Sequence, residues 1–217
     1  MDLNSRAAVS RAVHPIERRS YEILRARADL TGLPPWSRAV TERVVHASAD
    51  LGYLTDLVCV EESLAAGVRA LRSGAPIVTD TAMVAAGITA RSAVCRISDH
   101  RGAALAGEAG LTRSAAGVWV AWMDVGPGAV WVIGTAPTAL AELIAIGVEP
   151  ALVIGLPVGF VGAVEAKEAL RASGLPALTN RSEKGGAAVA VAAINALLYG
   201  RADVDEAADM GEEVPRG

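Results

Sequence analysis

One of the three histidines in the chain, His46, lies in a segment whose spacing suits acid–base chemistry. The segment ERVVHASADLGY runs from Glu42 to Tyr53, and Arg43 precedes the histidine by three residues. On a helix, positions i and i+3 lie on the same side, so the arginine could hold a carboxylate while the imidazole exchanges a proton near neutral pH. A core histidine or a solvated bystander would show the same pattern, and periodicity alone does not decide between them.

The residues around His46 predict a helix that packs on a sheet. Two prolines precede Ser37, which we expect to be the N-cap residue, and a continuous helical pattern follows. Four residues fall on a narrow arc that is expected to face the sheet: Val40, Val44, Ala47 and Leu51. Three others lie on the flank of that arc, where the wall of a cleft would be: Arg43, His46 and Asp50.

The chain as a whole predicts one α/β domain over residues 1–200, with a mostly parallel sheet of about five strands and helices on both faces. Short β-branched runs are the expected strands, at 76–79, 93–97, 129–134, 151–155 and 176–180. Helical patterns occupy 61–73, 102–123, 137–147, 162–173 and 185–199, and the last is expected to end at Gly200 as a C′ glycine. Residues 201–217 are acidic and predict a flexible tail.

The loops after the expected strands are rich in Gly, Pro, Thr, Asn and charged residues: DTAMVAAGIT, SDHRG, GTAPTAL, GLPVGFVG and NRSEKGG. The carboxyl ends of parallel strands meet at one edge of a sheet, where ligands bind. The loops therefore predict a ligand site there, although Gly and Pro could equally be turn residues in any one of them.

Composition and motifs argue against several other classes. A formal net charge of −4 gives no field that would attract nucleic acid, and the apolar stretches are shorter than the roughly 20 residues of a membrane span. The charged start lacks the apolar region of a signal peptide, so a cytoplasmic location is expected. Cys59, Cys95, His14 and His100 fit no metal or disulfide pattern, and GLPVGFVG spaces its glycines poorly for a dinucleotide site. We expect neither a metal nor a cofactor.

Seven segments follow one another between about residues 14 and 199: HPIERRSYEILRARADL, RVVHASAD, GAPIVTDTAMVAAGIT, TRSAAG, GTAPTAL, VIGLPVGFVGAVEAKEAL and NRSEKGGAAVAVAAINAL. Together they resemble the precorrin-8X methylmutase family of cobalamin biosynthesis. The resemblance implies an α/β homodimer with a parallel sheet, active sites near the subunit interface and no cofactor. It implies a methyl shift from C-11 to C-12 of a contracted tetrapyrrole, which turns precorrin-8X into hydrogenobyrinate or cobalt-precorrin-8 into cobyrinate.

The resemblance also assigns roles to individual residues. His46 matches the family's catalytic histidine, which implies a general acid/base. Four residues match positions that contact the carboxylated substrate: Ser20, Arg43, Thr89 and Arg113. Local alternatives exist, because Ser20 could cap a helix, Thr89 could close a turn and Arg113 could pair with a surface carboxylate.

Further residues near the strand ends are candidates of a second kind. Arg181 and Lys184 precede Gly185 and Gly186 at the start of the last helix, where the helix N-terminus would favour a carboxylate arm, so we expect substrate contacts there. Thr135 in GTAPTAL stands where the resemblance implies asparagine, and threonine lacks the two donors of the amide. Asp80 is expected to anchor loop backbone and Met83 to pack, rather than to bind ligand.

The expected partners are the tetrapyrrole substrate and product, a second copy of the chain and, through channelling, neighbouring enzymes of the pathway. Neither nucleic acid nor a membrane is expected. Two other functions stay open: a non-catalytic corrinoid carrier, and a nucleotide-dependent oxidoreductase on a generic doubly wound fold. The sequence leaves open whether the substrate contains cobalt.

Overall fold

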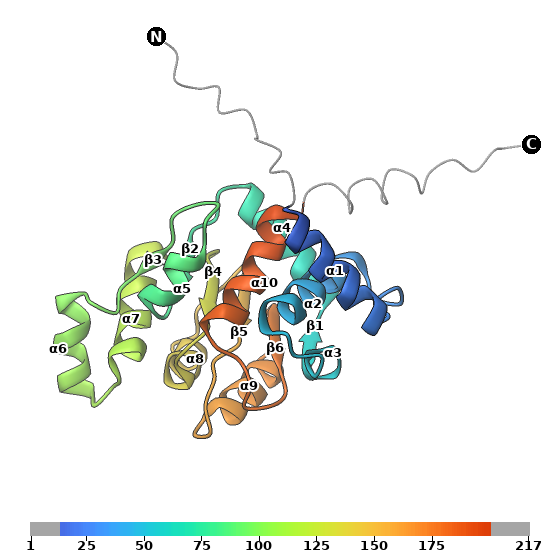
Figure 1. The fold of residues 1–217 in the computed structure, drawn as a ribbon. Helices are drawn as coiled ribbons and strands as arrows, with labels where there is room; N and C mark the ends of the chain where they lie inside the picture. Colours follow the sequence, from blue (N-terminus) through green and yellow to red (C-terminus); the bar gives the residue numbers. More distant parts are fainter. Residues whose placement is uncertain (1–13, 201–217) are drawn as a thin grey trace, which may run out of the picture.

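A six-stranded sheet runs through the structure in the order β1-β6-β5-β4-β2-β3 (Figure 1). The computed structural model describes residues 14–200, and the predicted acidic tail at 201–217 lies outside them. The strands are β1 (Leu57–Cys59), β2 (Ile77–Thr79), β3 (Val94–Cys95), β4 (Val130–Ile133), β5 (Leu152–Gly155) and β6 (Ala177–Asn180). All neighbours pair in parallel except β1, which is antiparallel to β6. The predicted fold class is confirmed, and each of the five expected strands is present.

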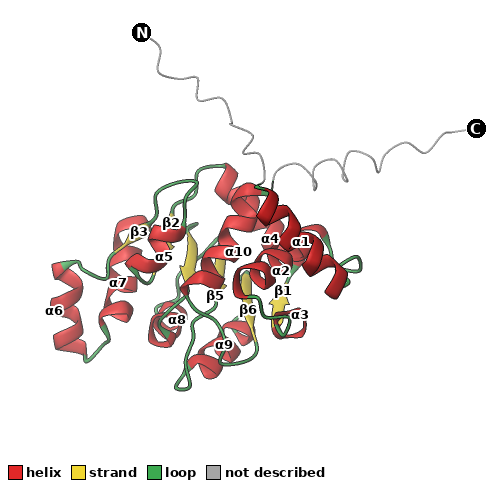
Figure 2. Ribbon diagram, in the orientation of Figure 1, coloured by secondary structure: helices red, strands yellow, loops and turns green. Residues whose placement is uncertain are grey.

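Helices cover both faces of the sheet, as Figure 2 shows with red helices around yellow strands. One layer contains α1 (Pro15–Arg27), α2 (Pro35–Ser48), α4 (Glu61–Arg72), α5 (Ala82–Gly87) and α10 (Ala187–Tyr199). The other contains α7 (Arg113–Val125), α8 (Pro137–Ala145) and α9 (Ala163–Ala172), with α6 (His100–Ala109) packed against α7. The short α3 (Tyr53–Asp56) leads into β1.

The alternation of side chains along the central strand divides the apolar core in two. Val130 and Val132 of β4 join the core under α2, α4 and α10, while Trp131 and Ile133 join the core under α7, α8 and α9. All four side chains are fully buried. A strand buried on both faces needs a continuous apolar run rather than an alternating one, which is why this segment was predictable.

One strand was missed, and one expected helix is divided in two. The sixth strand, β1, was not expected, because its three residues are too short to give a pattern of their own. The single helix expected over 102–123 is two helices, α6 and α7. Gly110 takes a left-handed φ of 65° and ends α6, and the hydroxyl of Thr112 accepts a hydrogen bond from the Ala115 amide and starts α7.

The start of α2 also differs from the expectation. The helix begins at Pro35 with Pro34 as its N-cap, so Ser37 lies in the first turn and is not the cap. The carboxylate of Glu61 in α4 takes the capping role, accepting from the amides of Trp36 and Ser37 at 2.9 Å each and from the Ser37 hydroxyl at 2.7 Å. A carboxylate from another helix thus satisfies donors that the local sequence does not.

The buried face of α2 is rotated from the predicted arc. Its buried residues are Trp36, Ser37, Val40, Thr41, Val44 and Val45, whereas Ala47 is exposed and Leu51 is 40% exposed. The helix packs chiefly on α10, with further contacts to α4 and α1, rather than on the sheet. The α10 helix ends at Tyr199 as predicted, although Gly200 has an ordinary φ of −70° and is no left-handed C′ residue. Between residues 14 and 200, no helix is long and apolar enough to cross a membrane.

Candidate functional site

His46 is held by two adjacent residues of α1. The Nδ1 atom of its ring lies 3.0 Å from the Oγ atom of Ser20, and the ring stacks on Tyr21 with centroids 4.4 Å apart and planes 14° from parallel. The imidazole is half-buried, and its Nε2 atom has no hydrogen-bond partner within residues 14–200. One nitrogen is therefore fixed by a hydroxyl, the ring plane is fixed by an aromatic neighbour, and the second nitrogen is left for a ligand.

Arg43, one turn before His46, interacts with two tyrosines, Tyr21 and Tyr199. Its guanidinium carbon is 6.0 Å from the ring centre of Tyr199, and the hydroxyl of that tyrosine is 2.7 Å from the Oγ1 atom of Thr89. Burial raises the pKa of Tyr21, and the positive charge of Arg43 works against that increase. A guanidinium that lies over an aromatic face can still donate to an anion through its edge.

The structure thus brings four of the predicted site residues into one group, which we call the His46 cluster: Ser20, Tyr21, Arg43, His46, Thr89 and Tyr199. Sequence reasoning missed the two tyrosines. Tyr21 follows Ser20 directly, and Tyr199 closes the last helix, so their positions were visible, but no periodic signal indicated that either would meet α2. They connect because α10 and α1 both pack on α2.

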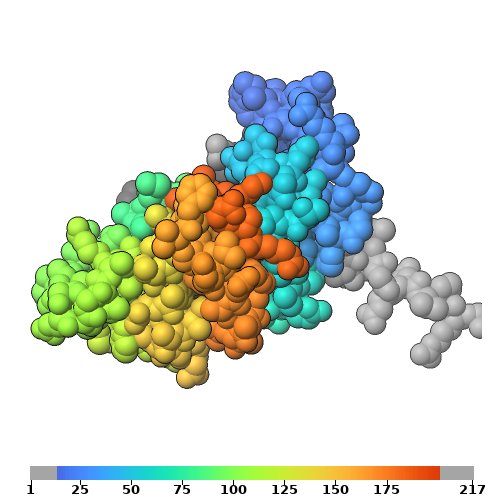
Figure 3. Space-filling view, turned by 90° about the horizontal axis from the view of Figure 1, so that it is seen from below, coloured from blue at the N-terminus to red at the C-terminus, as the bar shows by residue number. Residues whose placement is uncertain are grey.

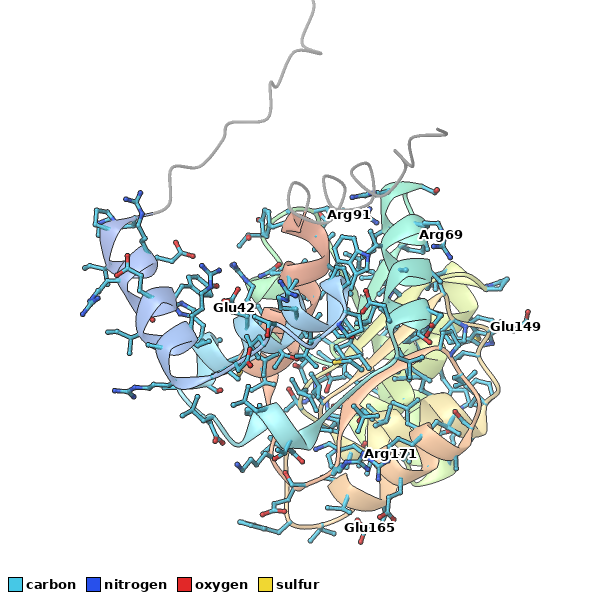
Figure 4. All side chains as sticks on the ribbon, turned by 90° about the vertical axis from the view of Figure 1, so that its right-hand side faces the viewer. Glu42, Arg69, Arg91, Glu149, Glu165 and Arg171 are labelled. Atoms are coloured by element: carbon cyan, nitrogen blue, oxygen red, sulfur yellow. The ribbon has the colours of Figure 1, made fainter. Side chains whose placement is uncertain are left out.

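An ion pair fixes α1 on α2 beside this cluster. Arg25 of α1 places its Nε and Nη2 atoms 2.5 and 3.1 Å from the two carboxylate oxygens of Glu42, which lies on α2 facing α1 (Figure 4). A two-point contact of this kind restricts both the separation and the rotation of the two helices. It therefore supports the distance between Ser20 and His46.

A cavity of about 130 Å³ lies between α1 and α2. Its lining consists of Ser20, Ile23, Leu24, Arg27, Val45, His46, Ala49 and Leu51. Ala49 has a left-handed φ of 53°, the one positive φ outside glycine among residues 14–200. Strained backbone of this kind tends to persist where neighbouring structure, and often a binding site, requires it.

Hydrogen bonds from buried polar side chains hold the loop at 181–186 in place, and we call this set of contacts the clamp. The Nζ atom of Lys167, a fully buried side chain on α9, donates to the carbonyls of Ser182 and Lys184 at 2.8 and 2.5 Å. Asn180 donates to the Lys184 carbonyl and to Asp56, and Asp56 accepts from the amide and hydroxyl of Ser182. Although burial opposes it, these hydrogen bonds hold the pKa of Asp56 below its ordinary value.

The loop places the exposed side chain of Lys184 beside Asp50, just after the histidine helix α2. Its Nζ atom lies 2.8 Å from the Oδ2 atom of Asp50, and this hydrogen bond is the main cause of the lowered pKa of Asp50. Arg181 has an exposed side chain, and its amide donates to Asp56. At the start of α10, the Gly186 amide is already used by the Leu156 carbonyl. The predicted carboxylate contacts of Arg181 and Lys184 remain predictions, and the partners of the Lys184 ammonium group are Asp50 and the ring of Tyr53.

Arg113 is separated from the other predicted residues. It begins α7 in the opposite helical layer, and Figures 1 and 3 show α6 and α7 at the other end of the molecule from α1 and α2. In Figure 3 the orange surface of the C-terminal third lies between them. A single subunit therefore does not bring Arg113 to His46.

At the carboxyl edge of the sheet, the Asp80 side chain anchors loop backbone, as expected. Its carboxylate accepts hydrogen bonds from the amides of Gly134, Thr135 and Ala136, at 3.2, 2.8 and 2.8 Å. Burial raises the pKa of Asp80, and these amide donors oppose the increase. The hydroxyl of Thr135 lies 3.1 Å from that of Thr81, so the threonine keeps one side-chain contact in the loop. Met83 is 70% exposed and is not packed, contrary to the expectation.

Comparison with known proteins supplies the family. The model of the precorrin-8X methylmutase family matches residues 15–200, which is nearly the whole described chain. The chain belongs to the precorrin-8X methylmutase family. Members of that family are isomerases of the methylmutase type, and the predicted enzyme class agrees with this.

Individual methylmutases of the family cover almost the same length. A precorrin-8X methylmutase of Pseudomonas aeruginosa is 42% identical over 198 residues, covering 86% of this chain and 95% of the relative. A cobalt-precorrin-8 methylmutase of Methanothermobacter thermautotrophicus is also 42% identical, over 191 residues, covering 85% and 92%. The crystal structure of a precorrin-8X methylmutase from Thermus thermophilus superposes with a TM-score of 0.77 at 33% identity, covering 92% of this chain and 98% of that one.

Proposed function

We propose that this protein moves a methyl group from C-11 to C-12 of precorrin-8X or cobalt-precorrin-8, giving hydrogenobyrinate or cobyrinate, with His46 as the general acid/base. The observation that carries the proposal is the geometry of the imidazole. A hydroxyl holds Nδ1, a ring supports its plane, and a cavity opens beside it. Family membership supports the reaction class.

The reaction requires one proton that is given to the substrate and later taken back. Protonating the conjugated ring where electron density gathers makes a neighbouring carbon electron-poor, and the methyl group migrates to it with its bonding pair. Loss of a proton then restores the conjugated product. The methyl never leaves the substrate, so the reaction consumes no group donor and no redox equivalent, and a residue that gives and regains one proton suffices.

Ser20 determines which nitrogen does this work. With Nδ1–H donating to the Ser20 Oγ atom, the imidazolium is the acid through its Nε2 proton, and the neutral ring that remains is the base through the Nε2 lone pair. In both protonation states Nε2 is the nitrogen that meets the substrate. The two states differ by one proton on Nε2 while Nδ1 keeps its own, so one contact with the serine serves both halves of the cycle.

Charged contacts to the substrate follow from the same geometry. Arg43 and Thr89 belong to the His46 cluster and are our proposed contacts for carboxylate arms. Arg181, Lys184 and Arg113 are further proposed contacts. Because Arg113 lies in the opposite helical layer, we propose a homodimer in which the second subunit contributes its Arg113 to the site. We also propose a cytoplasmic enzyme that passes its product to neighbouring enzymes of the pathway.

A direct test adds purified protein to precorrin-8X and, separately, to cobalt-precorrin-8, and follows the absorption change to the product. Turnover of one substrate and not the other would settle the cobalt question. The His46→Ala variant should lose about 10²-fold to 10⁴-fold in kcat, the usual range for a general acid/base. Tight product binding without turnover by the unmutated protein would mean a carrier, and full turnover by His46→Ala would remove the histidine from the mechanism.

A further inference from the structure

The cavity between α1 and α2 has the size of one ring substituent and not of a macrocycle. Its volume is about 130 Å³. A water molecule occupies about 30 Å³ in the liquid, so the cavity holds on the order of four or five non-hydrogen atoms. This is the size of an acetate or propionate arm. The ring that carries such an arm would have to lie outside, over the opening.

The lining suits an arm with an apolar stem and a charged end. Most of the wall is aliphatic: Ile23, Leu24, Val45, Ala49 and Leu51. Ile23 and Leu51 are 39% and 40% exposed, so they form the rim where methylene groups would pack. The polar lining consists of Ser20, His46 and Arg27, and only the arginine carries a permanent positive charge.

The charge of Arg27 is not matched within the described chain. On the same helix, Arg19 pairs with Glu22 at 3.0 Å and Arg25 pairs with Glu42 at 2.5 Å. Arg27 has no carboxylate partner within residues 14–200, although it lies in the last turn of α1 beside the cavity. A guanidinium without a partner at an apolar pocket is a natural receptor for a carboxylate, because its planar donors bind both oxygens.

We propose that this cavity is a subsite for one carboxylate-tipped arm of the tetrapyrrole, with the stem between Ile23 and Leu51 and the carboxylate on Arg27. The inference rests on the proposed function, which supplies the kind of ligand. Since His46 lines the same cavity, an arm anchored there fixes the adjacent ring edge relative to the imidazole. Arg27 is therefore a specificity-determining residue rather than a catalytic one.

The first experiment measures binding of hydrogenobyrinate, by its absorption change, to the full-length protein and to Arg27→Gln. The same titration uses the macrocycle with its carboxylates esterified as a neutral comparison. Arg27→Gln should weaken binding of the acid about tenfold, the size of one charge-assisted hydrogen bond, and leave binding of the ester unchanged. The matched control is Arg19→Gln, which removes a charge from the same helix away from the cavity and should change neither affinity.

A second variant tests the cavity without touching the charge. Ile23→Trp places a bulky indole ring at the rim of the cavity and should weaken binding of the acid and of the ester alike. The subsite would be overturned if Arg27→Gln bound the acid as tightly as the unmutated protein, or if Ile23→Trp left binding unchanged. Either result would leave the proposed methylmutase function standing. If the unmutated protein neither binds the macrocycle nor turns it over, the proposed function fails, and the subsite fails with it.

Discussion

The Oγ atom of Ser20 lies 3.0 Å from the Nδ1 atom of His46, although the two residues are 26 positions apart in the chain. The serine comes from α1 and the histidine from α2, and an ion pair between Arg25 and Glu42 holds the two helices together. The position of the imidazole is thus a property of the packing of two helices.

Removing the hydroxyl should slow the reaction and alter its pH dependence. We expect Ser20→Ala to lower kcat about tenfold, because loss of one hydrogen bond frees the ring and its tautomer. The measurement is kcat across pH for the variant and the unmutated enzyme. Ser48→Ala is the control, since the Ser48 hydroxyl bonds to the backbone of the same helix and not to the imidazole. An unchanged pH profile in Ser20→Ala would mean that the serine does not set the state of His46.

The aromatic ring of Tyr21 should contribute to kcat because it fixes the plane of the imidazole by stacking. Tyr21 stacks on His46, and an aromatic pair is worth about 1 kcal/mol beyond its buried area. Tyr21→Leu should therefore lower kcat about fivefold more than Tyr21→Phe does, because phenylalanine keeps the stack. Steady-state kinetics of both variants test this, and equal rates for the two would show that the stacking has no role.

The clamp beneath the 181–186 loop should contribute to stability. Lys167→Met removes the ammonium group that donates to the carbonyls of Ser182 and Lys184 and leaves Asn180 as the side chain that still donates to both, and we expect a loss of about 2 kcal/mol in the free energy of unfolding near pH 7. Urea unfolding measures it. Lys167→Arg keeps the charge and donors and should lose less, and a neutral effect of Lys167→Met would show that water replaces the lysine.

The same lysine predicts a pH dependence of stability. Burial lowers the pKa of Lys167 from its ordinary 10.5 to about 8. Between these pH values the unfolded chain binds more protons than the folded one, so the free energy of unfolding rises with pH in this window and is unaffected by this group below it. The difference in unfolding free energy between the unmutated protein and Lys167→Met should therefore grow from pH 7.5 to pH 9.5. A constant difference would mean that the amine titrates at its ordinary pKa.

The strained residue at the end of α2 should tolerate glycine. Ala49 has a φ of 53°, which costs a residue with a Cβ atom about 1 to 2 kcal/mol. Glycine relieves the strain but adds entropy to the unfolded chain, so we expect Ala49→Gly to stabilise the protein by about 0.5 kcal/mol. Thermal unfolding tests the sign. A destabilised variant would indicate that the Cβ atom packs in the cavity strongly enough to offset the strain.

Much of the fold was predictable because it depends on local composition. Strands buried on both faces require continuous apolar, β-branched runs, and the five expected runs are five of the six strands. The missing strand, β1, has three residues and pairs with β6, so its formation depends on a partner more than 100 residues away. The predicted start of α2 was wrong for a similar reason, because Glu61 of another helix caps it.

The sequence by itself determined the family, the β-branched strands and the candidate histidine, because residue types and ordered motifs are carried by the chain itself. Only the tertiary structure decided that Ser20 and Tyr21 hold the imidazole, that Tyr199 joins Arg43 to Thr89, and that Arg113 stands apart in the other helical layer. These relationships depend on how helices pack across long separations in sequence. Local periodicity gives the faces of a helix but not the neighbours that meet them.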